Sequence, residues 1–343
     1  MLYSRATLLS ITWLCVAFSP KGLAWGFYAH QRINRYAVFL LPPEMIGFYK
    51  KHIQFITEKA VNPDKRRYVV VGEAERHYID LDVYGDSAFY KMPRRWEDAL
   101  VRYSEDTLRT YGILPWNILW VKLQLTDAFQ RKDIPAILRL SADLGHYIGD
   151  ANVPLHTTEN YNGQKTGQHG IHGFWESRLP ELFADSYDFF IGRAQYEPHP
   201  LSRAWKAIGE AHFALDSVLR FERELTLKMG QDRKYSYETR NGLTVKVYSK
   251  EFSTAYHVML AGQVERRMRA SIQMVADFWY TCWVDAGQPD LNQLLQQPFE
   301  EPQEPASTGE PLPVRPHEGM PFGWKKFNPL GCCSEPLWAV VEK

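Results

Sequence analysis

Clusters of cysteine, runs of one charge and long hydrophobic stretches are all scarce in this sequence of 343 residues. The four cysteines are spaced in a way that does not fit a four-cysteine zinc site. Basic and acidic side chains balance at 40 each without a Lys/Arg-rich tail, which disfavours a protein that binds duplex DNA by charge. No internal repeat is present. Hydrophobic residues make up 45% of the sequence, and the aromatic residues among them 14%, which is enough for a large packed core.

The first 24 residues differ from the rest of the chain. Met1 to Arg5 is short and basic, Ala6 to Ser19 is almost wholly apolar, and Gly22 and Ala24 are small residues at the spacing that signal peptidase requires. The apolar run is shorter than the ~20 residues of a membrane span. We therefore expect a signal peptide cleaved after Ala24, and an exported (periplasmic or extracellular) protein without a transmembrane anchor.

Cleavage would make Trp25 the first residue and leave 38 basic against 40 acidic side chains. It would also leave three cysteines in an oxidising compartment. Cys282 could then pair with Cys332 or Cys333, and the sequence leaves this pairing open.

Hydrophobic periodicity predicts a mainly α-helical chain. The expected helices cover residues 25–41, 44–59, 94–111, 116–131, 133–151 with Asp133 as N-cap, 170–183, 200–229 in one piece or broken once, and 251–286. Strand signals are short, at 68–71 and at 244–248, where a preceding Arg240-Asn241-Gly242 turn indicates a hairpin. Proline recurs after residue 297. We expect one multi-helical catalytic domain at 25–296 and a Pro-rich extension at 297–343.

The strongest chemical signal is the segment that runs from Leu144 to His156 (LGHYIGDANVPLH). His146 and Asp150 are four residues apart on a predicted helix, so both face the same side and can share a metal ion. Pro154 ends that helix, and His156 follows on the turn. One helix and its exit thus supply three groups of the kind that bind zinc.

A second pair, His172 and Glu176, repeats the spacing of four residues. A lone pair of this kind is more often structural than metal-binding. Two such pairs within 31 residues, with His156 between them, favour a metal site. His169 lies on an expected loop, and we interpret it as a neighbour of the site rather than a ligand.

Two upstream segments complete the pattern, Asp64-Lys-Arg-Arg67 before His77-Tyr-Ile-Asp80, and Trp25-Gly-Phe-Tyr-Ala-His30 directly after the predicted cleavage site. With these segments the sequence resembles the zinc-dependent phospholipases C and the related zinc-dependent single-strand nucleases. These are helical proteins with three clustered zinc ions and a mature N-terminal Trp. The resemblance covers residues 25 to about 180, and more loosely the helices to about 286.

The resemblance implies three zinc sites whose ligands can be assigned one by one. Asp64, His77, His146 and Asp150 would hold the first ion; His156, His172 and Glu176 the second; and the free amine and carbonyl of Trp25 with His30 the third, with Asp150 bridging to the first. A water between two ions would become the nucleophile near neutral pH. Asp64 would help to orient this water, and Arg67 would stabilise charge in the transition state. Arg67 could instead be a solvated surface charge.

The phosphoester that would be cut is left open by the resemblance. The five-residue step from Trp25 to His30 and the Asp64/Arg67 pair match the nucleases, in which residues at the positions of Tyr78 and Asp80 contact a base. Glu176 and the 16-residue step from His156 to His172 match the phospholipases instead.

We therefore expect a phospholipase C-like phosphodiesterase as the first reading and a single-strand nuclease or 3'-nucleotidase as the alternative, both on a cluster of about three zinc ions. The substrate would be a phospholipid or a single-stranded nucleic acid, and we expect a monomer. A non-catalytic protein that keeps the metal ions for stability or binding is a third hypothesis.

Overall fold

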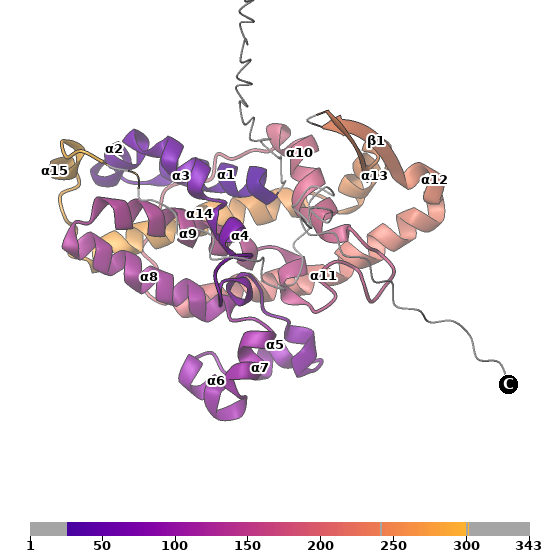
Figure 1. Ribbon diagram of the computed structural model, residues 1–343, viewed down its shortest axis with the longest axis horizontal. Coiled ribbons are helices and arrows are strands. Elements are labelled where there is room, and N and C mark those ends of the chain that lie inside the picture. The colour runs from indigo at the N-terminus through magenta and orange to yellow at the C-terminus, as the bar shows by residue number, and fades with distance from the viewer. Residues whose placement is uncertain (1–25, 241, 300, 302–343) are drawn as a thin grey trace, which may run out of the picture.

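The computed structural model describes residues 26–240, 242–299 and 301. These residues form packed helices and one two-stranded sheet, so the predicted mainly α-helical fold is confirmed (Figure 1). The expected signal peptide, Trp25, Cys332, Cys333 and nearly all of the Pro-rich extension lie outside the described residues. Among the described helices, none combines the length and the apolar character that crossing a bilayer requires.

The helices and strands have the following bounds. The α-helices are α1 (Gly26–Ala37), α2 (Pro43–Lys51), α3 (Ile53–Lys59), α4 (Asn62–Arg66), α5 (Ala88–Lys91), α6 (Trp96–Arg102), α7 (Glu105–Thr110), α8 (Leu114–Arg131), α9 (Ile134–Ala151), α10 (Leu179–Phe183), α11 (Pro200–Met229), α12 (Gln231–Lys234), α13 (Lys250–Met259), α14 (Gln263–Asp285) and α15 (Asn292–Leu295). The short turns are η1 (Val38–Leu40), η2 (Ala74–His77), η3 (Leu81–Tyr84), η4 (Pro154–Thr157) and η6 (Ala184–Ser186), η5 (Gly173–Arg178) is a π-helix, and the strands are β1 (Tyr235–Arg240) and β2 (Leu243–Tyr248).

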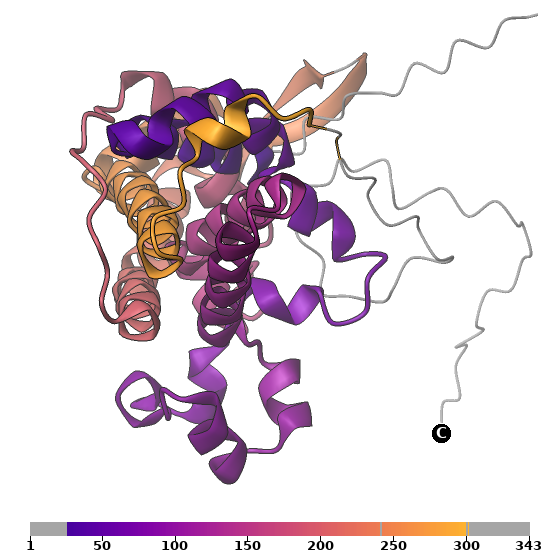
Figure 2. The ribbon, with the colours of Figure 1, turned by 90° about the vertical axis from the view of Figure 1, so that its left-hand side faces the viewer.

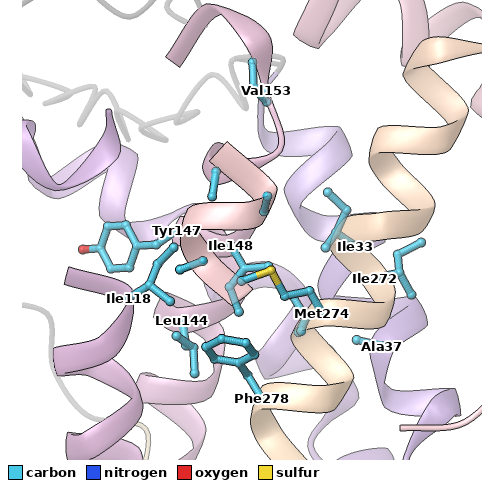
Figure 3. Packing of buried hydrophobic residues seen from close by; sticks show 14 of the residues in the cluster. Ile33, Ala37, Ile118, Leu144, Tyr147, Ile148, Val153, Ile272, Met274 and Phe278 are labelled. Carbon is cyan, nitrogen blue, oxygen red and sulfur yellow. The ribbon is translucent and has the colours of Figure 1, made fainter. Parts of the chain in front are cut away.

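Helix α9 runs through the middle of the protein and packs against α1, α3, α8, α11 and α14. Figure 3 shows its apolar side chains, among them Leu144 and Ile148, gathered with Ile33 of α1, Ile118 of α8 and Phe278 of α14. All five side chains are buried. Each such burial stabilises the fold by roughly 1.5–3 kcal/mol. The helix that carries the strongest sequence motif is therefore also among the most firmly held.

Two small units extend from the helical body. Helices α5, α6 and α7 form a lobe that projects from it in both views (Figures 1 and 2). The β1–β2 hairpin projects near α10 and α13 (Figure 1). Its strands pair antiparallel from Tyr235↔Tyr248 to Arg240↔Leu243, which matches the hairpin indicated by the Arg240-Asn241-Gly242 turn.

Several predicted helices are divided in the structure. The segment 44–59 breaks at His52, between α2 and α3. The segment 94–111 breaks at Ser104, whose side chain accepts a hydrogen bond from Thr107 N (3.2 Å) and so caps α7. The segment 251–286 breaks where Ala261 and Gly262 adopt positive φ values of 48° and 76°. In contrast, α11 continues unbroken for 30 residues.

The predicted strand at 68–71 is wrong. The backbone of Val69 and Val70 instead donates hydrogen bonds to the carbonyl of Arg66, at 2.9 and 2.8 Å, which forms a turn after α4. The β-branched residues that suggested a strand have no neighbouring strand here to pair with in the part of the chain that the structure describes.

Candidate metal centre

Helix α9 and the segment after it place the main ligand-type side chains. Asp133 caps the helix by accepting a hydrogen bond from Ala136 N (3.0 Å), as predicted, which fixes where α9 begins. His146 and Asp150 then fall on the same side of its last two turns, with His146 Nε2 3.3 Å from Asp150 Oδ2. The η4 turn that follows Val153 carries His156.

A first ligand group consists of Asp64 from α4, His77 from η2 and His146 and Asp150 from α9. His77 Nδ1 lies 3.0 Å from Asp150 Oδ2 and 3.1 Å from His146 Nε2. Asp64 Oδ1 lies 3.7 Å from His77 Nδ1 and 3.8 Å from His146 Nε2. The donor atoms of His77, His146 and Asp150 thus lie close enough together to hold one ion, and Asp64 can also share an ion with His146 and His30; all four residues of the group are buried.

A second ligand group consists of His156, His172 and Glu176. His172 Nε2 lies 2.6 Å from Glu176 Oε2 and 3.2 Å from His156 Nε2. His156 Nε2 lies 3.4 Å from the same Glu176 oxygen. Glu176 lies inside the π-helix η5, whose wider turn still brings it over His172, four residues earlier.

A third ligand group consists of His30 from α1 with Asp150 and Glu176. His30 Nε2 lies 3.3 Å from Asp150 Oδ1 and 3.5 Å from Glu176 Oε1. Asp150 therefore turns one oxygen to the first group and the other to the third, as the bridging assignment requires. Glu176 likewise turns one oxygen to the second group and one to the third, which the sequence reasoning missed. Trp25, the remaining predicted member, lies outside the described residues.

The hydrogen bonds behind the imidazole rings fit metal binding. His146 Nδ1 donates to the carbonyl of Ala60 (2.8 Å), and His156 Nδ1 donates to the carbonyl of His77. A carbonyl only accepts, so both Nδ1 atoms carry the proton and both Nε2 lone pairs point into the cluster. Nitrogen lone pairs and carboxylate oxygens that face each other in a buried site repel each other unless a proton or a metal ion lies between them.

Two buried atoms without an aligned hydrogen bond also support metal binding at this site. Within the described residues, His30 Nε2 and Asp150 Oδ1 are buried and lie 3.3 Å apart without forming an aligned hydrogen bond, so they interact through charge alone. Leaving such groups unsatisfied is costly in a folded protein. The donor set of imidazole nitrogens and carboxylate oxygens is the one that zinc accepts. The residues present therefore fit zinc.

The charged groups of the cluster shift one another's pKa values strongly. Burial alone would lower the pKa of His30, but the carboxylates of Asp150 and Glu176 outweigh burial and raise this pKa to about 10. Burial would raise the pKa of Asp150, yet the surrounding histidines hold it well below its usual range. Burial lowers the pKa of His77 to about 4. The charges within the cluster thus favour an ionised Asp150 and a protonated His30.

Arg67 points inward, so its interpretation as a solvated surface charge is wrong. Its side chain is 2% exposed, and Nη1 lies 3.7 Å from Asp64 Oδ1. The adjacent Arg66 is anchored elsewhere, since it donates two hydrogen bonds to Asp143, at 2.9 and 3.2 Å, and one to Glu73. The ion pair between Arg66 and Asp143 fixes α4 in the orientation that turns Asp64 and Arg67 toward the first group.

Glu73 is a buried neighbour of the site that the sequence reasoning missed. It accepts a hydrogen bond from the Tyr147 hydroxyl, and its Oε1 lies 3.9 Å from His77 Nε2, on the side of the ring opposite the first group. At 3.9 Å the carboxylate acts on the ring through its charge and does not form the hydrogen bond that usually orients a ligand histidine. The spacing of four residues between Glu73 and His77 is the signal that could have revealed it.

The predicted substrate-contacting residues follow His77 directly. Both Tyr78 and Asp80 are buried; the Tyr78 hydroxyl donates to the carbonyl of Thr110 (3.2 Å), and Asp80 N donates to the carbonyl of Tyr111 (2.7 Å).

His169 is exposed, in keeping with its interpretation as a neighbour. The Cys282 thiol is buried and donates to the carbonyl of Lys122, while its predicted disulfide partners lie outside the described residues.

Comparisons with known proteins give a remote likeness to two toxins. No family model and no curated protein matches this chain. Alpha-toxin from Clostridium absonum is 11% identical, with a TM-score of 0.45 over 80% of this chain and 67% of the toxin chain. Alpha-toxin from an avian strain of Clostridium perfringens is 12% identical, with a TM-score of 0.40 over 75% and 64%. The chain thus spans about two thirds of each toxin's length.

Proposed function

We propose that this chain is an exported, zinc-dependent phosphodiesterase of the phospholipase C type, with the catalytic domain at 25–296 behind a signal peptide at 1–24. The observation that supports this most is the convergence of three ligand groups on two shared carboxylates, Asp150 and Glu176. Groups that share a carboxylate hold their ions close together. Clustered zinc ions suit phosphoester cleavage, because the reaction needs both a nucleophile and neutralisation of charge.

Different residues of the chain would contribute to the nucleophile and to the neutralisation of charge. Zinc ions held by the three groups would supply Lewis-acid polarisation of the phosphoryl oxygen and activation of water near neutral pH. Asp64, at the edge of the first group, orients the attacking water by accepting its hydrogen bond. Arg67 places a fixed positive charge 3.7 Å from Asp64 Oδ1, where it neutralises charge that develops on the phosphate. Burial of the site strengthens both interactions.

A single-strand nuclease or 3'-nucleotidase is the second candidate. The inward orientation of Arg67 favours it, since an arginine three residues after this aspartate belongs to the nuclease pattern. Tyr78 and Asp80 would then contact a base. Glu176 and its short spacing from His156 favour the lipid substrate instead, so the two candidates differ in substrate rather than in the metal centre.

The decisive experiment starts from protein that begins at Trp25. Bound metal is measured, and hydrolysis of bis-p-nitrophenyl phosphate is followed before chelation, after chelation and after zinc is returned. We expect about three zinc ions per chain and activity that zinc restores. If metal is bound but turnover is absent, the protein is a non-catalytic metal-stabilised one, and the enzymatic proposal fails.

A second assay separates the substrates. Phosphatidylcholine and other phospholipids are compared side by side with single-stranded DNA and RNA at equal zinc occupancy. Lipid cleavage without nuclease turnover supports the phospholipase C-type reaction. Nuclease turnover without lipid cleavage replaces it with the second candidate.

A further inference from the structure

The π-helix η5 is fastened at both sides of Glu176 by elements outside the ligand groups. Two residues before Glu176, the ring of Phe174 stacks on Tyr248 of β2, with centroids 3.7 Å apart and planes at 6°. Two residues after Glu176, Arg178 donates to both carboxylate oxygens of Glu238 on β1. The hairpin thus holds η5 through one aromatic contact and one bidentate ion pair.

The ion pair belongs to a larger network. Arg178 Nε also donates to the carbonyl of Tyr248 (3.3 Å), and Arg240 Nη2 donates to Glu238 (3.1 Å) and to Glu181 of α10 (2.9 Å). Arg178 is buried while Glu238 is partly exposed, so the pairing lies at the edge of the packed interior and solvent screens it in part. A planar guanidinium that grips a carboxylate with two hydrogen bonds fixes orientation as well as distance.

A π-helix is an uncommon conformation that exists where surrounding contacts impose it, often at functional sites. If η5 relaxed to an α-helix, residues after His172 would rotate, and the oxygens of Glu176 would leave both His156 and His30. Glu176 is the residue that the second and third groups share. Its direction therefore determines two of the three proposed metal positions.

We propose that Arg178 is a positioning residue for the metal centre. Its ion pair with Glu238 of the hairpin maintains the π-helical turn, and this turn directs one oxygen of Glu176 to the second group and the other to the third group. This inference rests on the proposed metal-dependent function. The hairpin, which contributes no residue to the three ligand groups, becomes a structural support of the centre.

The test compares Arg178→Met, Arg178→Lys and Glu238→Gln with the unchanged protein. Zinc affinity is measured by competition with a chromophoric chelator, and the environment of the site by the visible absorption of the Co²⁺-loaded protein. Substitution of residues that orient ligands typically weakens metal binding about 10–100-fold. We expect a loss in this range for Arg178→Met, with a changed Co²⁺ spectrum, and smaller losses for Arg178→Lys and Glu238→Gln.

Arg220→Met is the matched control, because Arg220 also bridges two carboxylates, Asp216 (3.1 Å) and Glu224 (3.3 Å), but on an exposed face of α11. It should leave zinc affinity and the Co²⁺ spectrum unchanged. The double variant Arg178→Met/Glu238→Gln should bind zinc about as weakly as Arg178→Met alone, since both changes break one pair.

Each outcome decides between the two proposals. If the unchanged protein binds no zinc, the proposed function fails and this inference with it. If it binds zinc and the Arg178 and Glu238 variants bind it equally well with the same Co²⁺ spectrum, Arg178 is merely structural while the proposed function stands. Should Arg178→Met fail to fold, Glu238→Gln decides alone, because Glu238 is partly exposed and its replacement keeps the shape of the side chain.

Discussion

The backbone of Gly149 lies directly against the imidazole of His30, so that a Cβ added at Gly149 would come within 2.8 Å of His30 Nδ1 and Cε1. One turn earlier on α9, a Cβ at Gly145 would come within 1.9 Å of Asn34 Oδ1. The two glycines thus let α1 approach α9 closely. Because Asp150 follows Gly149, the same close approach brings His30 Nε2 to the Asp150 carboxylate.

Replacing Gly149 by alanine should therefore displace His30 from the third group. A contact under 3 Å with a ring in a packed interior cannot be accommodated without movement. We expect Gly149→Ala to lose one zinc ion per chain, or to weaken the most weakly held ion about tenfold or more, while the first and second groups stay filled. Metal content after dialysis at controlled free zinc measures this.

Gly47→Ala is the control, since Gly47 lies in α2 and its nearest neighbour, Leu295 Cδ1, would be 3.9 Å away. The change should keep all the zinc and stabilise the fold by up to about 1 kcal/mol, because alanine is the better helix former. Full zinc retention by Gly149→Ala would show that His30 does not hold an ion.

The shared carboxylates lead to a second prediction, on stoichiometry. Asp150 faces both the first and the third groups, whereas His172 belongs to the second group alone. Asp150→Ala should therefore lose more than one zinc ion per chain, and His172→Ala only one. Metal analysis of both variants, with Asp216→Ala on an exposed surface as control, gives the answer. Equal losses for Asp150→Ala and His172→Ala would contradict the bridging role of Asp150.

Much of the centre could be predicted from local spacing. The Asp133 cap and the four-residue step from His146 to Asp150 specify one helix and one face, and both depend on neighbours in sequence. The step from His172 to Glu176 indicated proximity even though the segment is a π-helix rather than an α-helix, because residues four apart stay close in both. The breaks at Ser104 and at Ala261 depend on caps and positive φ values that periodicity does not register.

The contributions that come from packing could not be predicted in this way. Glu176 lies close to His30 because α1 packs against η5. No local sequence pattern indicates this packing. Arg66 and Arg67 are adjacent and chemically alike, yet Arg66 pairs with Asp143 while Arg67 faces Asp64, a division that depends on tertiary contacts. The role of Arg178 likewise depends on a hairpin 60 residues away in the sequence.

Zinc binding to the metal-free protein should release protons at neutral pH. The pKa of His30 in the metal-free cluster is raised to about 10, so this histidine is protonated at pH 7, and a ligand histidine must be neutral. The stability that the protonated ring contributes is fully present below its unfolded pKa of about 6.5 and is lost as the pH rises through about 10. Zinc affinity should therefore increase with pH across that window.

Calorimetric titration of the metal-free protein with zinc, in two buffers of different ionisation enthalpy, counts the protons released. The variant His30→Gln should release about one proton fewer per chain than the unchanged protein. If the two proteins release equal numbers, the proton on metal-free His30 does not exist, and the raised pKa is refuted.

Arg67 should contribute to turnover rather than to metal binding. Its guanidinium is buried beside Asp64 but is itself not a zinc ligand, because it offers hydrogen-bond donors and no lone pair that could bind a metal ion. Removing one preorganised donor of this kind typically lowers kcat about 10²–10³-fold. We expect Arg67→Met to show such a loss of kcat with its zinc content intact. Arg67→Lys keeps the positive charge but not the paired donors of the guanidinium, so its loss of kcat should be smaller. Arg95→Met, at a largely exposed position, should behave like the unchanged protein. A normal kcat in Arg67→Met would remove Arg67 from the reaction, and lost zinc would instead assign it to support of Asp64.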